Sequence, residues 1–180
     1  MANALPTPDR PILLVGLMGA GKTTVGRLLA KRLGLGFVDS DEEVERAAGG
    51  SVTEIFERLG ETAFRDEERR VLERLIVGGP RVIAAGGGAF SDSATRALAL
   101  ERCIAIWLDG DVATLADRAA RDSRRPLLAG KDPVQVLSEL AERRGPSLAE
   151  AQLRVASHSG SPERIVERIV EALAARAGPD

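Results

Sequence analysis

The sequence predicts an α/β fold of three layers, in which helices cover both faces of a five-stranded parallel sheet. Short apolar runs alternate along the chain with segments of helical periodicity, a pattern typical of parallel strands joined by crossover helices. The 180 residues are 44% hydrophobic and 29% charged, as in globular proteins with one substantial core. We expect a single domain over residues 1–180, with its core at about 11–176 and a loose N-terminal tail at 1–10.

Each strand is expected where a short apolar run is bounded by turn residues. The helices carry their own start signals. Ser51 and Glu54 form a capping box, whereas Asp132 and Ser161 are N-cap residues that each precede a proline. The first helix starts near residue 23, and the last helix continues to about 175 with apolar residues along one face. The expected strands are residues 12–15, 36–38, 81–85, 103–108 and 153–157.

A glycine-rich loop lies between the first strand and the first helix. Residues 16–23 read GLMGAGKT and fit the pattern G-x-x-x-x-G-K-[ST], the phosphate-binding loop of P-loop kinases and NTPases. Its glycines allow a sharp turn whose N–H groups point at anionic oxygens, beside the positive end of a helix. Lys22 is expected to reach the β- and γ-phosphates of ATP and Thr23 to hold Mg²⁺. The flanking strand and helix favour this P-loop kinase fold over a chance match. The expected nucleotide contacts are Gly19, Ala20, Gly21, Lys22, Thr23 and Thr24.

Two carboxylates, Asp39 and Asp41, follow the second strand, at the edge of the sheet where ligands of open α/β folds collect. Either residue alone would be interpreted as the N-cap of the next helix. Behind a phosphate-binding loop, one carboxylate can hold the water shell of Mg²⁺ while the other accepts a hydrogen bond from an attacking hydroxyl. Phosphoryl transfer depends mainly on orientation and charge neutralisation, so we expect Asp41 to position the acceptor first and to accept its proton second.

Two further segments have both a structural and a functional interpretation. Arg65 lies in a strongly charged helix that continues to about residue 76, and it is either an exposed ion-pair partner or a ligand contact. Gly86, Gly87 and Gly88 follow the third strand. Three residues without side chains either form a flexible turn or allow a ligand to lie against the backbone.

Composition excludes several classes of partner. The formal net charge of −2 argues against broad binding to nucleic acid or anionic membranes. Cys103 is the sole cysteine and lies in an apolar run, so a buried structural thiol in a reducing compartment is expected. The N-terminal tail lacks the apolar core of a signal peptide, and no apolar run approaches the ~18 residues of a membrane span. We expect a cytoplasmic monomer that acts on a small molecule.

In the order and spacing of its motifs, the chain resembles the shikimate kinases of aromatic amino-acid biosynthesis. The resemblance implies a kinase that uses Mg-ATP to phosphorylate the 3-hydroxyl of shikimate, a cyclic polyol carboxylate. The products would be shikimate 3-phosphate, on the route to chorismate, and ADP. The resemblance covers about residues 11–175 and includes residues 16–23, 38–41, 55–68, 86–88 and 125–128.

The resemblance also implies roles for residues around the acceptor. Asp39 would help to hold Mg²⁺ through water, Asp41 would bind the hydroxyls of shikimate, and Arg65 would pair with its carboxylate. The second carboxylate-binding arginine of the family falls on Arg144, and the backbone of residues 86–88 would complete the pocket. Two guanidinium groups around one carboxylate make bidentate pairs, which explains how a mildly acidic protein can select an anionic substrate.

A mobile lid is implied at about residues 119–132, and a substrate-binding segment at about 40–70. Arg125 of the lid would fold over the transferring phosphate, where a closed loop excludes water. Arg118 would lie against the adenine. The catalytic residues implied by the resemblance are Lys22, Asp41 and Arg125.

The chain departs from the family pattern at two places. The family commonly has tyrosine at the position of Leu148, and often has Ser or Thr shortly before the triple glycine, where this chain has Ala84 and Ala85. The packing behind the second arginine and one metal-water contact are therefore expected to differ. One-residue shifts also leave two alternatives open, which are Arg143 for Arg144 and Arg124 for Arg125.

Two other functions are compatible with part of the pattern. A kinase of another hydroxylated metabolite, such as gluconate or a nucleoside monophosphate, would share the phosphate loop but has no reason to combine Asp41 and Arg65 with a triple glycine. A nucleotide-binding module without catalysis would fit the altered residues 84–85 and 148. It would not account for the full set of Lys22, Thr23, Asp39 and Asp41.

Overall fold

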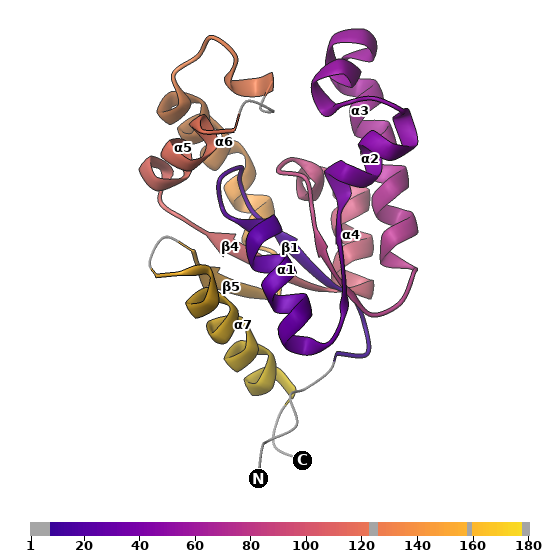
Figure 1. The fold of residues 1–180 in the computed structure, drawn as a ribbon, viewed down its shortest axis with the longest axis vertical. Coiled ribbons are helices and arrows are strands. Elements are labelled where there is room, and N and C mark those ends of the chain that lie inside the picture. The colour runs from indigo at the N-terminus through magenta and orange to yellow at the C-terminus, as the bar shows by residue number, and fades with distance from the viewer. Residues whose placement is uncertain (1–7, 123–125, 158–159, 178–180) are drawn as a thin grey trace.

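The computed structural model describes residues 8–122, 126–157 and 160–177. Within these residues, five strands form one parallel sheet in the order β2-β3-β1-β4-β5, with β1 at the centre (Figure 1). The predicted α/β fold is confirmed, and the ends of each predicted strand lie within one residue of the observed ends. The strands are β1 (Ile12–Val15), β2 (Gly36–Asp39), β3 (Arg81–Ala84), β4 (Ile104–Asp109) and β5 (Leu153–Ala156).

Helices cover both faces of this sheet. In Figure 1, α1 and α7 pack against each other on the near face, while α4 lies on the far face and packs against α3. α2 packs against α3, and α5 packs against α6. The helices are α1 (Lys22–Leu33), α2 (Ser40–Ala48), α3 (Val52–Ile76), α4 (Ser93–Arg102), α5 (Val112–Ala120), α6 (Pro133–Leu148) and α7 (Pro162–Ala177), with the short 3-10 helices η1 (Ala89–Ser91) and η2 (Pro126–Leu128).

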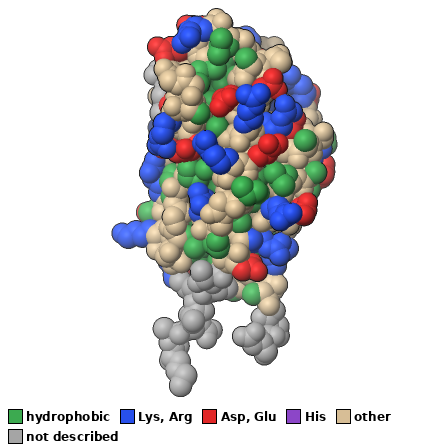
Figure 2. Space-filling view, turned by 90° about the vertical axis from the view of Figure 1, so that its right-hand side faces the viewer, with side chains coloured by type: hydrophobic (Ala, Val, Ile, Leu, Met, Phe, Trp, Pro, Cys, Tyr) green, Lys and Arg blue, Asp and Glu red, His purple; other side chains and the backbone are tan. Residues whose placement is uncertain are grey.

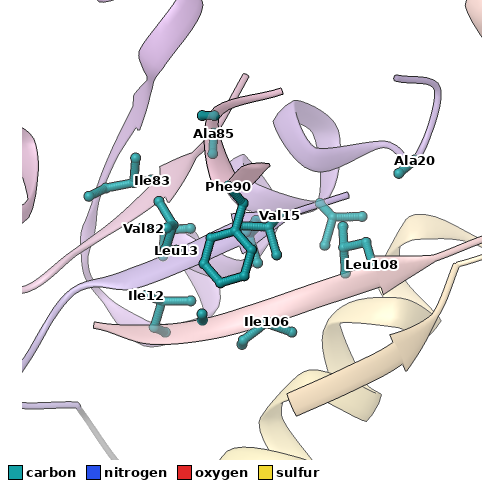
Figure 3. Close-up of a cluster of buried hydrophobic side chains, with 14 of the residues drawn as sticks. Ile12, Leu13, Val15, Ala20, Val82, Ile83, Ala85, Phe90, Ile106 and Leu108 are labelled. Carbon is teal, nitrogen blue, oxygen red and sulfur yellow. The ribbon is translucent and has the colours of Figure 1, made fainter. Parts of the chain in front are cut away.

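The centre of the core is β1, which is buried at every position. A strand covered on both faces has a continuous apolar run rather than an alternating one, as this segment does. Figure 3 shows the side chains of β1 together with those of β3 and β4, and the ring of Phe90 lies over them. Phe90 comes from η1, so the turn that follows β3 is anchored in the core.

The candidate functional segments meet at one edge of the sheet because all the strands are parallel and end there. The phosphate loop follows the central strand β1, and the triple glycine follows its neighbour β3. Asp39 ends β2 and lies in register with Ala84 of β3. The connection that follows β1 leads to β2 on one side, whereas the connection that follows β3 leads to β4 on the other side of β1. Such a switch in direction creates a crevice at the carboxyl ends of these strands.

α3 contains a sharp break at Gly60, where φ is 81° and ψ is 171°. The helix starts with the predicted capping box, since Ser51 Oγ accepts the N–H of Glu54 and the Glu54 carboxylate accepts the N–H of Ser51. The break folds the first part of the helix back, and the rings of Phe56 and Phe64 lie 4.6 Å apart between centroids. The two halves of α3 therefore form a wall beside Arg65.

α6 continues through Pro146 and ends at Leu148. Proline lacks the N–H of the helical ladder, and the residue before a proline is normally forced out of the helical region by its own Cβ. Gly145 has no Cβ, and its carbonyl accepts the N–H of Ala149 at 2.9 Å. The Gly-Pro pair is thus accommodated, and Arg144 is held on a continuous helix.

The outer surface over α3 and α4 carries charges of both signs. Figure 2 shows acidic and basic side chains interspersed on this face. Pairs such as Arg69 with Asp66 and Arg70 with Glu67 follow helical spacing along α3, as is usual on a solvated helix face. In the described part of the chain, no helix is both long enough and apolar enough to cross a bilayer.

Candidate active site

The phosphate loop surrounds the ammonium group of Lys22. Lys22 Nζ donates hydrogen bonds to the carbonyl oxygens of Gly16, at 2.8 Å, and Leu17, at 3.0 Å. Gly19 has a φ of +82°, and a Cβ at this position would lie 2.3 Å from the carbonyl oxygen of Leu115, so the position requires glycine. The loop therefore presents a positive charge and a helix N-terminus at the end of the central strand, an arrangement that suits nucleotide phosphates.

A hydroxyl and a carboxylate meet beside this lysine. Thr23 Oγ1 donates a hydrogen bond to Asp39 Oδ2 at 2.6 Å. The other oxygen, Oδ1, accepts the N–H of Asp41 at 2.9 Å and caps α2, so the N-cap and metal interpretations of Asp39 fit the same side chain. The described residues contain no group of three or more His, Cys, Asp or Glu side chains suited to a metal. Mg²⁺ bound to ATP needs only one or two oxygen ligands from the protein, and Thr23 and Asp39 can supply them.

A second charged cluster lies against the triple glycine. Arg65 Nη1 donates a hydrogen bond to Glu68 Oε2 at 2.7 Å. A Cβ on Gly86 would lie 2.2 Å from Glu68 Oε1 and 2.7 Å from Asp41 Oδ1. A Cβ on Gly88 would lie 2.8 Å from the Arg65 guanidinium. Charged side chains of α2 and α3 therefore pack directly on this turn, and a Cβ at Gly86 or Gly88 would displace them.

Glu68 also belongs to this cluster, although the sequence pattern predicts no role for it. Its side chain is only 3% exposed, and its Oε1 atom has no hydrogen-bond partner among the described residues. Burial raises the pKa of Glu68, although the Arg65 guanidinium opposes the shift. The one available signal was its position three residues after Arg65, which places both side chains on one face of a helix.

Arg144 reaches the same turn from α6. Its Nη1 donates a hydrogen bond to the carbonyl oxygen of Gly87 at 2.8 Å. Burial lowers the pKa of Arg144 to about 10, and the positive charges of Arg65 and Arg143 add to this effect. The guanidinium is still charged at neutral pH. Arg143 itself is exposed, so of the two adjacent arginines Arg144 is the one directed at the site.

A cavity of about 490 Å³ joins the phosphate loop to the charged cluster. Its wall also includes aromatic side chains from both halves of α3, Phe56 and Phe64. Phosphate-binding and carboxylate-binding groups therefore share one space. The predicted site residues that line the cavity are Gly19, Gly21, Lys22, Thr23, Thr24, Asp39, Asp41, Arg65, Gly87, Gly88, Arg118 and Arg144.

Two predicted contacts, Ala20 and Gly86, are buried and are not part of this wall. The N–H of Ala20 donates to the carbonyl oxygen of Leu17 at 3.2 Å, within the loop. The N–H of Gly86 donates to the buried hydroxyl of Ser40 at 2.9 Å. These N–H groups are engaged within the protein, so Gly86 contributes by leaving room for Glu68.

The nucleotide side of the cavity includes Arg118 on α5, whose Nη1 donates to the carbonyl oxygen of Ser157 at 3.3 Å. This bond connects α5 to the segment that follows β5. Leu127 of η2 also lines the cavity, so the described part of the expected lid reaches the site. Arg125 and its alternative Arg124 lie outside the described residues.

Comparison with known proteins shows the family to which the chain belongs. A model of the shikimate kinase family matches residues 18–174. The chain belongs to the shikimate kinase family. It is 54% identical over 168 residues to the shikimate kinase of Caulobacter vibrioides, covering 93% of this chain and 84% of that protein. It is 51% identical over 164 residues to the shikimate kinase of Zymomonas mobilis, covering 91% of this chain and 93% of that protein.

A solved shikimate kinase has the same fold. The structure of the Acinetobacter baumannii shikimate kinase in complex with shikimate is 37% identical, with a TM-score of 0.93, and the match covers 96% of this chain and 97% of that chain. The family, the P-loop kinase fold and the use of ATP and Mg²⁺ that the sequence predicts are thus confirmed.

Two departures from the shikimate kinase pattern are visible in the site. Ala85 lines the cavity with a methyl group, where the family often has a hydroxyl nearby. Leu148 is 3% exposed and packs in the core behind Arg144. A hollow of about 190 Å³, lined by Leu148, Gly145 and Trp107 among others, adjoins it. Leu148 thus fills this place with an apolar side chain.

Proposed function

We propose that this shikimate kinase transfers the γ-phosphoryl group of ATP to the 3-hydroxyl of shikimate, which yields shikimate 3-phosphate and ADP. The observation that carries the proposal is the shared cavity, which Lys22 and Thr23 line together with Asp41, Arg65 and Arg144. An acceptor for this space must be both anionic and hydroxylated. The solved relative from Acinetobacter baumannii is described as a complex with shikimate, which has both properties.

Arg65 and Arg144 are the groups that we assign to the substrate carboxylate. A planar guanidinium offers two parallel N–H donors to a carboxylate, which gives both energy and orientation. The positive charge of Arg65 lowers the pKa of Arg144, so the two groups repel each other in the folded protein. A bound carboxylate would offset this repulsion, and the site therefore selects an anion.

Asp41 is the group that we assign to the acceptor hydroxyl. As the bond between the hydroxyl oxygen and the γ-phosphorus forms and the bond to the β–γ bridging oxygen breaks, Asp41 accepts the hydroxyl proton. Lys22 stabilises the negative charge on the phosphoryl oxygens. Thr23 and Asp39 would hold Mg²⁺, which supplies further charge neutralisation across the β- and γ-phosphates.

Segment roles complete the proposal. We assign residues 40–70 to substrate binding and residues 119–132 to a lid, with Arg118 on the adenine. The role of Arg125 over the transferring phosphate is supported by the family resemblance alone. All of these segments would belong to one domain over residues 1–180, whose unfolding should be a single cooperative transition.

The test is a panel of acceptors. The purified chain is given Mg-ATP with shikimate, gluconate or a nucleoside monophosphate, and ADP release is followed by a coupled assay, with the product identified by phosphorus NMR. Of these acceptors, we expect shikimate to be the single one that causes rapid ADP release. Lys22→Met and Asp41→Asn should lower kcat by about 100-fold or more without unfolding the chain. Turnover of gluconate or a nucleotide instead of shikimate would contradict the proposal, and ATP binding without any turnover would indicate a non-catalytic module.

We also propose that the chain acts as a cytoplasmic monomer. Burial raises the pKa of the Cys103 thiol to about 12, so this thiol is unreactive and suited to a reducing compartment. The face in Figure 2 has interspersed charges, which do not favour self-association there. Light scattering after size exclusion should give one chain mass of 19.1 kDa, and a dimer mass would contradict the proposal.

A further inference from the structure

An arginine outside the cavity joins three segments around the triple-glycine turn. Arg96 on α4 donates from Nη1 to the carbonyl oxygens of Phe90, at 3.0 Å, and Ser91, at 3.2 Å. Its Nε atom lies 3.1 Å from Glu150 Oε1, just beyond the end of α6. The Arg96 side chain is 17% exposed, whereas that of Glu150 is 51% exposed, so the guanidinium lies at the border between the protein and solvent. One guanidinium thus connects α4, η1 and the end of α6.

The carbonyls that Arg96 binds belong to the same compact turn as the glycines. The N–H of Ala89 donates to the carbonyl oxygen of Gly86 at 3.1 Å, and the N–H of Ser91 donates to that of Gly88 at 3.1 Å. The Phe90 ring anchors one side of this turn in the core (Figure 3). A displacement of Ser91 would therefore be transmitted to Gly88, which lies against the Arg65 guanidinium.

The contact between Arg96 and Glu150 acts on the helix that carries Arg144. The N–H of Glu150 donates to the carbonyl oxygen of Ser147 at 3.1 Å, so Glu150 belongs to the turn that closes α6. Arg144 lies further back on α6 and donates to Gly87 at 2.8 Å. The turn and α6 are consequently tied at two points, through Arg144 at Gly87 and through Arg96 and Glu150 at Ser91.

We propose that Arg96 is a positioning residue of the substrate pocket: its guanidinium fixes the triple-glycine turn against the end of α6 and thereby sets where Arg144 meets a substrate carboxylate. This inference rests on the proposed function. Within the described residues, the hydrogen bonds and the ion pair of Arg96 go to η1 and Glu150 and not to the phosphate loop. Loss of Arg96 should therefore weaken binding of shikimate and leave binding of ATP unchanged.

The test compares Arg96→Ala with Arg102→Ala, a control on the same helix whose side chain is 61% exposed and pairs only with Glu101 in the described structure. We expect Arg96→Ala to raise the KM for shikimate about tenfold, with the KM for ATP within about twofold of wild type. Arg102→Ala should change neither KM. Glu150→Ala removes one of the Arg96 contacts and should raise the shikimate KM about threefold.

Conservative replacement separates positioning from simple stabilisation. Lysine can keep the charge but cannot reach all three acceptors in one geometry, so Arg96→Lys should raise the shikimate KM about threefold. If Arg96→Ala does not fold, Arg96→Lys and Glu150→Ala decide the question. A lower melting temperature with an unchanged shikimate KM would overturn the inference, as would an equal rise in both KM values. Wild type without shikimate turnover would instead refute the proposed function, and this inference with it.

Discussion

The Arg65 guanidinium is oriented by several neighbours within the protein. It donates to Glu68 at 2.7 Å, lies 3.6 Å from Glu61, and its central carbon is 5.2 Å from the centroid of the Phe64 ring. Arg65→Lys replaces this planar fork with a point charge. We expect the KM for shikimate to rise by about tenfold or more while the KM for ATP is unchanged. Steady-state kinetics with each substrate varied in turn measures both.

The matched control for this change is Arg70→Lys, on the same helix with a side chain that is 76% exposed. It should alter neither KM. Arg65→Ala should cost ~2–5 kcal/mol of shikimate binding, because the partner charges are left unpaired in a partly desolvated site. An unchanged shikimate KM in Arg65→Lys would remove Arg65 from the pocket.

The burial of Glu68 predicts that the stability of the protein depends on pH in a specific direction. Burial raises its pKa in the folded state above the usual value of 4.5, so the folded protein keeps this proton to higher pH than the unfolded chain does. The contribution to stability is full below that usual value and is lost as the pH rises through the folded pKa. Because glutamine does not titrate, the unfolding free energy of wild type relative to Glu68→Gln should fall as the pH rises from about 4. Urea unfolding at several pH values measures this difference, and a difference that is constant or grows with pH would contradict the assignment.

At the scale of single residues, the sequence identifies functional residues whose spacing is fixed by a local backbone motif. Lys22 and Thr23 are identified because a phosphate loop requires them at those positions. Glu68 was missed because an acid on a charged helix is normally solvated, and its burial depends on α3 packing against a turn from another strand. The choice between Arg143 and Arg144 required knowing that α6 stays helical through Pro146.

Among the elements, the break in α3 is the feature that shapes the pocket wall. With φ at 81° and ψ at 171°, Gly60 occupies a region that is essentially restricted to glycine. Gly60→Ala should therefore lower the unfolding free energy by ~1–3 kcal/mol. It should also raise the KM for shikimate, because the break brings Phe56 against Phe64 beside Arg65. Denaturant unfolding and kinetics measure the two effects.

Gly36→Ala is the control for backbone strain. A Cβ at Gly36 would meet nothing within 4 Å, and its φ is not in the left-handed region. The change should leave stability within about 1 kcal/mol of wild type. Equal stability of the Gly60 and Gly36 variants would mean that the backbone conformation at the break does not require glycine.

Element boundaries follow closely from the sequence where turn residues bound an apolar run, as they do for β1 and β3. The capping box of α3 is likewise readable because its reciprocal hydrogen bonds depend only on Ser51 and Glu54. The passage of α6 through Pro146 was not predictable from proline alone, which normally ends a helix. It becomes understandable once Gly145 is seen to remove the clash before the proline.

For the whole molecule, nucleotide binding should be linked to folding. A ligand that binds the folded state alone adds ~2.7 kcal/mol at a concentration of about one hundred times its Kd. Mg-ATP should therefore raise the melting temperature of wild type, and chelation of Mg²⁺ with EDTA should remove most of that rise. Lys22→Met should show a smaller rise than wild type. Equal shifts with and without Mg²⁺ would exclude Thr23 and Asp39 as a metal pair.

The arrangement of the whole sheet was only partly accessible from the sequence. Alternating strands and helices predict parallel strands with their ligand segments at one edge. They do not give the order β2-β3-β1-β4-β5, in which β3 lies between β1 and β2. That order places the triple glycine between the phosphate loop and the carboxylates that follow β2, and it depends on long-range packing rather than on any local pattern.

The central claim is that two guanidinium groups bind a carboxylate beside the phosphate loop. The most direct test is the ratio of kcat/KM for shikimate to that for its methyl ester. The ester keeps every hydroxyl and the ring but has no charge. We predict that wild type favours shikimate by ~100-fold or more, since buried donors would be left without their anion. Equal kcat/KM for the acid and the ester would contradict the account.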